Sequence, residues 1–171
     1  MTASGPYKAS VLALIAGSPP RVLVVRKNCR LESPWRCDVA LPGGRVKGGE
    51  GLIEAALREA WEEAFIHPCL VSPIAVTGPF PTMNGLAVVY AVVARPRGPL
   101  DPMPRDREVD FAGWVRLDAV ASAGPVEHPA RGVVYGVRLP GGLVLWGVTL
   151  RILSSLLGVA RSGVLDVAGP Y

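Results

Sequence analysis

Residues 41–66 read LPGGRVKGGEGLIEAALREAWEEAFI, a glycine-rich segment followed by a periodic one. In the second half, small and apolar residues recur at intervals of four, from Leu52 to Ala64. This spacing predicts an amphipathic helix over 52–66. Pro68 limits the helix, because the residue before a proline is pushed out of the α region. The pattern therefore predicts a glycine loop that leads into a helix.

Three carboxylates share one face of this helix. Glu62 and Glu63 follow Glu59 by three and four residues, which confines the three to an arc of roughly 100°. Like charges at this spacing repel, so a helix selected only for stability would avoid them. Arg58, four residues before Glu62, offsets part of the repulsion. The alternative, a solvated acidic face, leaves the glycine loop beside the carboxylates unexplained.

The ligand chemistry of this region favours a hard divalent cation. Mg²⁺ prefers oxygen ligands and often joins one or two carboxylates to substrate phosphates. Gly43 and Gly44 can turn backbone carbonyls toward a ligand without a Cβ in the way. A zinc site would need His or Cys, and neither His67 nor Cys69 has partners at ligand spacing. We expect His67 and His128 to be surface or capping residues.

Written as a pattern, the stretch is Gly44-x5-Glu50-x7-Arg58-Glu59-Ala60-x-Glu62-Glu63. It resembles the Nudix box, the signature of hydrolases that cleave a nucleoside diphosphate linked to another moiety. The resemblance implies Mg²⁺ or Mn²⁺ as cofactor and attack of water on a phosphorus of the diphosphate. The metal ligands that it implies are Glu59, Glu62 and Glu63, with Glu50 as a weaker or outer ligand and the carbonyls of Gly43 and Gly44.

The resemblance also implies further catalytic roles. Arg58 would hold Glu62 in its rotamer, and the catalytic base would be a box glutamate or Glu108. The chain departs from the box at Phe65, where the family has glycine. Either Phe65 adopts a left-handed conformation, at a cost of about 1–2 kcal/mol, or the helix continues to Pro68.

Outside the box, residues 145–153 (LWGVTLRIL) are similar to the I-W-G-x-T-x-x-I-L segment of the coenzyme A diphosphatase branch. Arg26 precedes Leu41 by fifteen residues, which matches the spacing in that branch. The branch's Phe, Arg and Gly are replaced at Leu41, Ser33 and Cys37. Segment 145–153 also fits the start of a core helix with no role in substrate binding.

The resemblance makes coenzyme A or a relative the first substrate, cleaved to 3′,5′-ADP and 4′-phosphopantetheine. Arg26 and Arg45 are candidates to hold its phosphates, because a guanidinium presents a planar donor fork. ADP-ribose, NADH or nucleoside triphosphates are the alternative substrates. An inactive Nudix-shaped binding module is a further alternative, although such a module should have lost one of the three metal carboxylates.

The remaining pattern predicts an α/β fold, a Nudix-type α/β/α sandwich in which a mixed β-sheet carries helices on both faces. We expect a single domain over 1–171, with a core at about 8–160 and a short C-terminal tail over 161–171. A second helix is expected over 148–159 and a short one over 117–122. The expected strands are 10–16 and 21–27 as a hairpin, 37–41, 71–80, 85–95, 109–116, and 133–139 with 143–146 as a second hairpin.

Composition narrows the class of protein and its partners. Half of the 171 residues are apolar, which excludes intrinsic disorder, and the longest apolar run, 86–94, is too short to span a membrane. The net charge of +4 is scattered, which favours a small polyanionic substrate over nucleic acid. The odd number of cysteines predicts reduced thiols in a cytoplasmic protein rather than a disulfide. A homodimer is one alternative for the oligomeric state.

The content of polar residues bears on the temperature at which the source organism grows. The chain has no Gln and two Asn, and Arg outnumbers Lys by fifteen to three. Depletion of thermolabile amides fits a thermophile. A GC-rich genome would also favour arginine over lysine.

Overall fold

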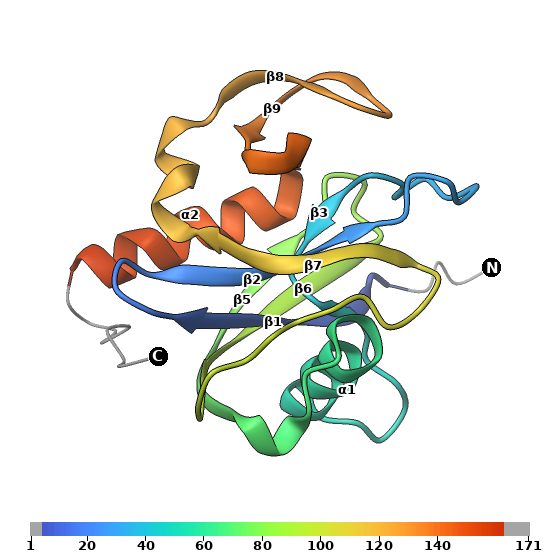
Figure 1. Cartoon of the computed structure of the whole chain (residues 1–171). Helices are drawn as coiled ribbons and strands as arrows, with labels where there is room; N and C mark the ends of the chain where they lie inside the picture. Colours follow the sequence, from blue (N-terminus) through green and yellow to red (C-terminus); the bar gives the residue numbers. More distant parts are fainter. Residues whose placement is uncertain (1–4, 163–171) are drawn as a thin grey trace.

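The computed structural model describes residues 5–162, so most of the tail expected over 161–171 lies outside the described residues. Within these residues ten strands and two α-helices follow one another, and Figure 1 shows how they are arranged. The strands are β1 (Tyr7–Ala16), β2 (Arg21–Lys27), β3 (Val39–Ala40), β4 (Gly43–Arg45), β5 (Val71–Pro81), β6 (Ala87–Pro96), β7 (Val109–Arg116), β8 (Gly124–His128), β9 (Gly132–Arg138) and β10 (Val144–Trp146). The helices are α1 (Leu52–Ala64) and α2 (Gly147–Arg161), with 3₁₀ turns at Pro68–Leu70, Leu117–Ser122 and Pro140–Gly142.

The strands form a mixed sheet in the order β5-β6-β1-β2-β3-β10-β9-β8, with β4 also paired to β1 and β7 to β2. The β1–β6 and β3–β10 pairs are parallel and the others are antiparallel. Strands β1 and β2 pair only beside their connecting turn, through Ile15 with Val22 and Ala16 with Arg21. Beyond that point β1 pairs with β4 and β2 with β3, while β7 pairs with the other side of β2, so the sheet divides into two parts. Strand β5 is left as one outer edge.

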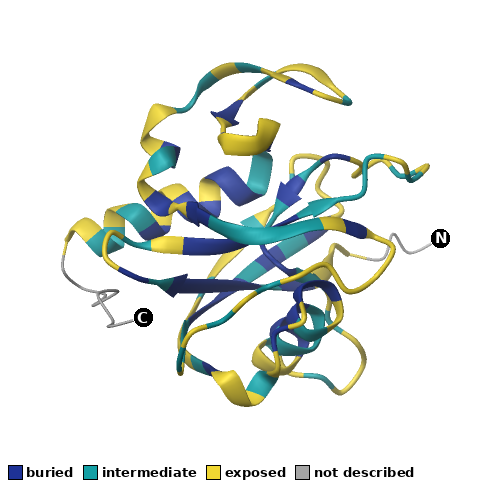
Figure 2. Ribbon diagram, in the orientation of Figure 1, coloured by how far each residue is buried: buried dark blue, intermediate teal, exposed yellow. Residues whose placement is uncertain are grey.

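Helices cover both faces of the sheet, which confirms the predicted sandwich. Figure 1 shows α1 on one side of the strands and α2 on the other, and Figure 2 shows the buried residues gathered between them. Alternate residues of β1 enter different cores, because successive side chains of a strand point to opposite faces. Leu12 and Leu14 pack with the alanines of α1, whereas Ala13 and Ile15 pack with Ile152 and neighbouring residues of α2.

Several local predictions are confirmed. The two expected hairpins form as β1–β2 and β9–β10. Helix α1 ends at Ala64, because Phe65 adopts the left-handed conformation at φ 58° and ψ 35°. The first of the two alternatives for this residue is therefore correct. The short helix expected over 117–122 forms as a 3₁₀ turn, whereas strands β4 and β8 were not expected.

The prediction of three reduced thiols is wrong. Cys29 and Cys37 form a disulfide, with their Cα atoms 4.5 Å apart, while Cys69 is free and exposed. The chain leaves β2 at Lys27 and returns beside it, where the N–H of Cys37 donates to the carbonyl of Lys27 at 2.9 Å. This closure brings the two cysteines together, and a count of cysteines cannot reveal it.

Within residues 5–162, neither α1, α2 nor any shorter helix has the length and apolar character needed to cross a bilayer.

Candidate active site

The glycine loop is held against β1 and the start of α1. Gly43 and Gly44 lie in β4 opposite Val11 and Ser10, and the hydroxyl of Ser10 donates to the Leu52 carbonyl at 2.7 Å. A Cβ on Gly43 would lie 2.5 Å from Val11, and a Cβ on Gly44 would lie 2.5 Å from the carboxylate of Glu59. Both glycines have negative φ. They are required here by close packing rather than by an unusual backbone conformation.

Arg58 gathers three of the predicted ligands around one guanidinium. Its Nε and Nη2 donate to the two oxygens of Glu50 at 2.7 and 3.1 Å. Its Nη1 donates to Glu59 at 2.8 Å and to Glu62 at 3.3 Å. The bonds from Arg58 lower the pKa of Glu50 to about 2, and the carboxylates raise the pKa of Arg58. The guanidinium therefore favours the ionised form of Glu50 and holds the three carboxylates close together.

Glu63 points to the other side of the cluster. Its side chain is 3% exposed; its Oε1 pairs with Nζ of Lys27, and its Oε2 accepts the N–H of Gly43 at 3.2 Å. Burial raises the pKa of Glu63 to about 7, against the opposing effect of Lys27. Burial lowers the pKa of Lys27, but Glu63 and the nearby Glu108 and Glu59 together outweigh it and raise that pKa.

The sequence analysis singled out Arg26 and missed Lys27. Adjacent strand residues face opposite sides of a sheet, so only one of these two cations can face α1. Arg26 instead bonds to Asp110 on β7 at 2.7 Å. The alternation of side chains along β2 indicates from the sequence that Arg26 and Lys27 face opposite sides of the sheet. It does not indicate which of the two faces α1.

The other predicted residues lie around the cluster. The guanidinium of Arg45 lies 4.0 Å from the ring centroid of Tyr7, while its carbonyl accepts from Arg58 at 3.2 Å. The carbonyl of Glu108 accepts the N–H of Asn28 at 2.8 Å. The structure therefore brings Glu50, Arg58, Glu59, Glu62 and Glu63 into one cluster, places the carboxyl of Glu108 within electrostatic range of Lys27, and turns Arg26 away.

A cavity of about 500 Å³ adjoins the cluster. Lys27, Gly43 and Gly44 line the end beside the carboxylates. Most of the remaining wall is apolar, and the polar residues that line it come from several separate segments of the chain. The lining includes Tyr7, Ala9, Val11, Trp35, Asp38, Val39, Leu41, Thr82, Met83, Asn84, Val89, Arg131, Trp146, Thr149 and Ile152.

Asp38 is hydrogen-bonded to two other residues that line this cavity, Arg131 and Trp146. It accepts two bonds from Arg131, at 3.1 and 2.9 Å, and one from the indole N–H of Trp146 at 3.1 Å. The guanidinium of Arg131 lies 4.8 Å from the ring centroid of Trp146. The sequence analysis missed Asp38 and Arg131, because they are 93 residues apart and neither belongs to a motif.

His128 is a capping residue, which is one of the two roles expected for it, and it does not lie at the surface. Its side chain is buried, and Nε2 lies 3.1 Å from Asp38 without the alignment of a hydrogen bond. Burial lowers the pKa of His128. His128 caps a turn, since its Nδ1 accepts the N–H of Ala130 at 3.1 Å. His67 caps the 3₁₀ turn at Pro68–Leu70, as expected.

The carboxylate cluster fits a hard divalent cation by the chemistry of its donors. Four glutamates meet two cations, Arg58 and Lys27, which leaves an excess of negative charge. As placed, no three His, Cys, Asp or Glu side chains within residues 5–162 form a ready metal-binding group. The carboxylate oxygens are instead paired with Arg58 and Lys27. A cation that binds there must draw these oxygens away from their present partners.

Comparison with known proteins gives consistent matches. A family model described as the NUDIX domain matches residues 6–137. An uncharacterized Nudix hydrolase, NudL, of Klebsiella pneumoniae subsp. pneumoniae is 31% identical over 157 residues, which cover 87% of this chain and 80% of that protein. The Klebsiella aerogenes protein of the same name is 37% identical over 86 residues, which cover 50% of this chain and 72% of the relative.

Solved structures show the same fold. RenU, a Nudix hydrolase from M. smegmatis, superposes with a TM-score of 0.67 at 22% identity, covering 94% of this chain and 89% of that one. The NUDIX domain of Shewanella oneidensis NrtR, solved in complex with ADP ribose, gives a TM-score of 0.59 at 15% identity, covering 95% and 91%. At these identities the likeness concerns the fold alone.

Proposed function

This chain belongs to the Nudix family of hydrolases, which act on pyrophosphate bonds, and we propose that it cleaves the diphosphate of coenzyme A or a relative with Mg²⁺ or Mn²⁺. The observation that carries the proposal is the cavity that opens beside the carboxylate cluster. Lys27, Gly43 and Gly44 line this cavity, and Lys27 and Gly43 also bond to Glu63 of the cluster. A diphosphate at this end would leave the rest of the substrate in the cavity.

Residues of this chain would hold the cation and accept the proton in the proposed reaction. Glu59, Glu62 and Glu63 would hold the cation, with Glu50 further out, and Arg58 fixes three of these four carboxylates relative to one another. When bound, such a cation lowers the pKa of the attacking water and neutralises charge on phosphate oxygens. A carboxylate must accept the proton of that water, and we propose a box glutamate or Glu108 for this role.

The proposal of coenzyme A rests on the segment that contains Trp146. Trp146 and Thr149 line the cavity, and the indole of Trp146 is fixed by Asp38 and Arg131. Two side chains of this segment line the space beside the proposed diphosphate site, which supports a role in substrate binding in addition to the start of a core helix. The mostly apolar wall suits a long substrate arm that carries few charges.

A substrate panel tests this function. Coenzyme A, acyl-coenzyme A, ADP-ribose, NADH and nucleoside triphosphates are incubated with Mg²⁺ and with Mn²⁺, and the products are separated. We expect hydrolysis that stops in chelator, with coenzyme A giving 3′,5′-ADP and 4′-phosphopantetheine. A kcat/KM for ADP-ribose more than about tenfold above that for coenzyme A would overturn the substrate. Absence of hydrolysis across the panel would indicate a binding module.

A further inference from the structure

Lys27 lies inside the acidic cluster rather than at its rim. It is the last residue of β2, and its ammonium pairs with Oε1 of Glu63 from α1. Glu59 of the helix and Glu108 of the loop before β7 also act on this ammonium electrostatically. It therefore occupies a position that is suitable for a bound cation.

Both oxygens of Glu63 are engaged in this arrangement. Oε1 pairs with Lys27 and Oε2 accepts from Gly43. A divalent cation at Oε1 would stand close to the ammonium, and like charges in a partly buried site repel strongly. Binding of the cation to Glu63 and pairing of Lys27 with Glu63 therefore oppose each other.

The cavity offers Lys27 another position. Its side chain lines the cavity at the end next to Gly43 and Gly44. Lysine carries a compact charge on a flexible four-carbon stem, so its ammonium can move without the strand moving. Arg131, the other cation among the described lining residues, is fixed by two bonds to Asp38 and by contact with Trp146. Lys27 is thus the lining cation that can change partner.

We propose that Lys27 exchanges partners during binding. It holds Glu63 in place in the metal-free protein, and it transfers to a phosphate oxygen of the diphosphate when the cation takes Glu63. The inference rests on the proposed function, and it adds a substrate-binding residue that lies outside the box. Lys27 would supply the positive charge near the diphosphate that Arg26, paired with Asp110, does not.

The first arm of the test measures Mn²⁺ affinity of the metal-free protein by calorimetry, without substrate. Lys27→Met removes the competing ammonium, so we expect Mn²⁺ to bind about tenfold tighter or more than in the wild type. Lys47→Met is the matched control, because Lys47 is exposed near Glu50 and the variant loses the same charge. The control should bind Mn²⁺ with an affinity close to that of the wild type.

The second arm measures binding of α,β-methylene-ADP, a diphosphate that cannot be cleaved at its bridge, in saturating Mn²⁺. We expect Lys27→Met to bind it about tenfold more weakly, and Lys47→Met to bind it as the wild type does. Circular dichroism and melting temperature check folding. Lys27→Gln, which keeps a hydrogen-bond donor for Glu63, replaces Lys27→Met if the latter does not fold.

The outcomes separate this inference from the proposed function. Unchanged or weaker Mn²⁺ affinity in folded Lys27→Met would overturn the competition at Glu63. Tighter Mn²⁺ binding with unchanged affinity for the diphosphate would overturn the exchange. A wild-type protein that binds no Mn²⁺ would instead overturn the proposed metal-dependent function, and this inference with it.

Discussion

At the scale of single residues, Glu63 is a carboxylate that is almost completely removed from water. It is 2% exposed, and burial raises its pKa to about 7. Burying a carboxylate costs free energy unless charges and hydrogen bonds compensate for it. Lys27 and the Gly43 N–H provide that compensation. A role in the reaction gives a physical reason for keeping such a costly group.

Glu63→Gln should separate chemistry from folding. The change keeps the shape of the side chain and removes a full ligand charge, so kcat should fall about 10²–10⁴-fold, by more than KM rises. Steady-state kinetics on the best substrate of the panel measures this. The melting temperature in chelator should stay the same or rise. Wild-type turnover by a folded variant would show that Glu63 does not take part in the reaction.

The raised pKa of Glu63 also predicts a pH dependence of stability in chelator. The folded protein holds this proton up to about pH 7, whereas the unfolded chain releases it near the ordinary value of 4.5. The free energy of unfolding should therefore fall as the pH rises between these values. The melting temperature of Glu63→Gln relative to that of wild type should rise over the same window. Parallel pH profiles for the two proteins would contradict this expectation.

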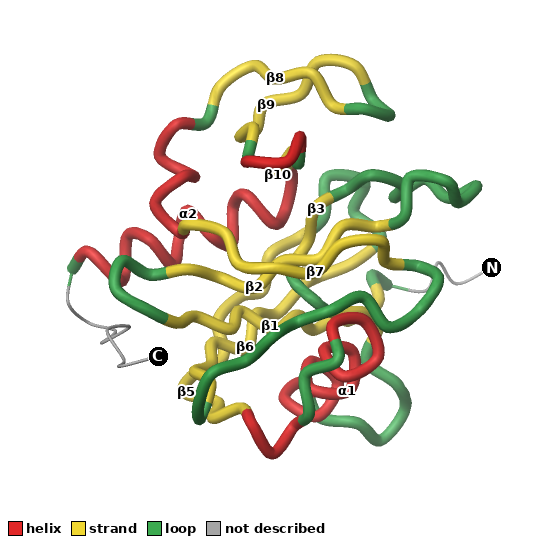
Figure 3. Tube along the Cα trace, in the orientation of Figure 1, coloured by secondary structure: helices red, strands yellow, loops and turns green. Residues whose placement is uncertain are grey.

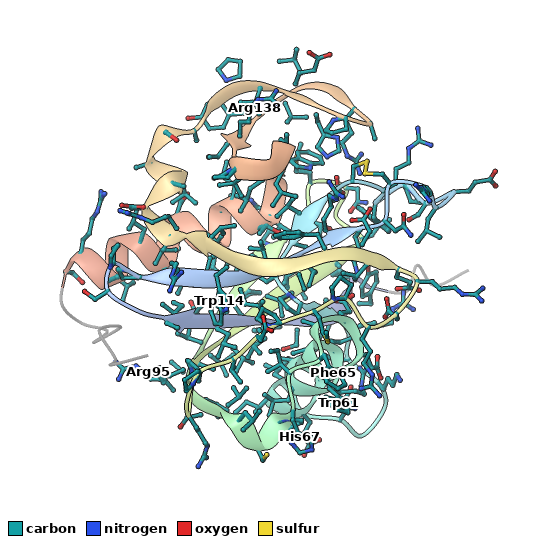
Figure 4. The ribbon with its side chains drawn as sticks, viewed as in Figure 1. Trp61, Phe65, His67, Arg95, Trp114 and Arg138 are labelled. Carbon is teal, nitrogen blue, oxygen red and sulfur yellow. A yellow bond between two sulfur atoms is a disulfide. The ribbon has the colours of Figure 1, made fainter. Side chains whose placement is uncertain are left out.

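At the scale of elements, the end of α1 shows how the fold accommodates Phe65 at a position where the Nudix box has glycine. The left-handed backbone lets the N–H of Phe65 bond to the Ala60 carbonyl. The Phe65 ring stacks on Trp61 with centroids 4.9 Å apart, and Arg105 lies over Trp61 at 3.9 Å. Figure 4 shows Phe65, Trp61 and His67 together at this end of the helix. Ring contacts therefore offset part of the backbone strain.

Two substitutions at Phe65 separate the contribution of the ring contacts from the cost of the left-handed backbone. Phe65→Ala loses the ring contacts and keeps the strain, whereas Phe65→Gly loses both. We expect the glycine variant to be more stable than the alanine variant by about 1 kcal/mol, because only glycine adopts this conformation freely. Urea denaturation measures the difference. Equal stabilities would show that the left-handed backbone at Phe65 is not strained.

Elements with strong local patterns could be predicted from the sequence. Helix α1 has apolar residues at helical spacing, and β6 is a continuous apolar run, so both were found within a few residues. Strand β8 begins with Gly124 and Pro125 and alternates polar residues with apolar ones only briefly. Its pairing with β9 defines it, and the flanking residues carry little signal for that pairing.

At the scale of the whole molecule, the cavity wall depends on contacts between distant segments. The tight turn between β8 and β9 (Figure 3) is attached to the loop over 28–38 through Arg131, which bonds to Asp38 and to the Pro34 carbonyl. The disulfide between Cys29 and Cys37 closes the same loop, which carries Trp35 into the cavity wall. Glu59, Glu62 and Glu63 could be found from the sequence because they lie on one helix, whereas the cavity wall could not, because its residues come from distant segments that meet only in the folded structure.

Reduction of the disulfide should therefore affect both stability and substrate binding. Its closed loop is short, with a sequence separation of 8, and a loop of that length stabilises a fold by roughly 2–3 kcal/mol. Adding reductant should lower the melting temperature and raise KM more than it lowers kcat. Cys29→Ser should show the same effects without reductant, whereas Cys69→Ser should behave as wild type. Identical melting temperature and KM in the oxidised and reduced proteins would contradict this expectation.

The outer edge formed by β5 affects how the molecule behaves at high concentration. An exposed strand edge can recruit a strand from another copy and so begin aggregation. In β5, Pro73, Pro79 and Pro81 have no N–H to donate, and two register irregularities interrupt the pairing line. Without the prolines and the irregularities, the exposed apolar side chains of Ile74 and Val76 would favour association with another strand at this edge. The prolines thus protect the chain from sheet-to-sheet association during synthesis and refolding, and assembly of two copies through this edge is disfavoured.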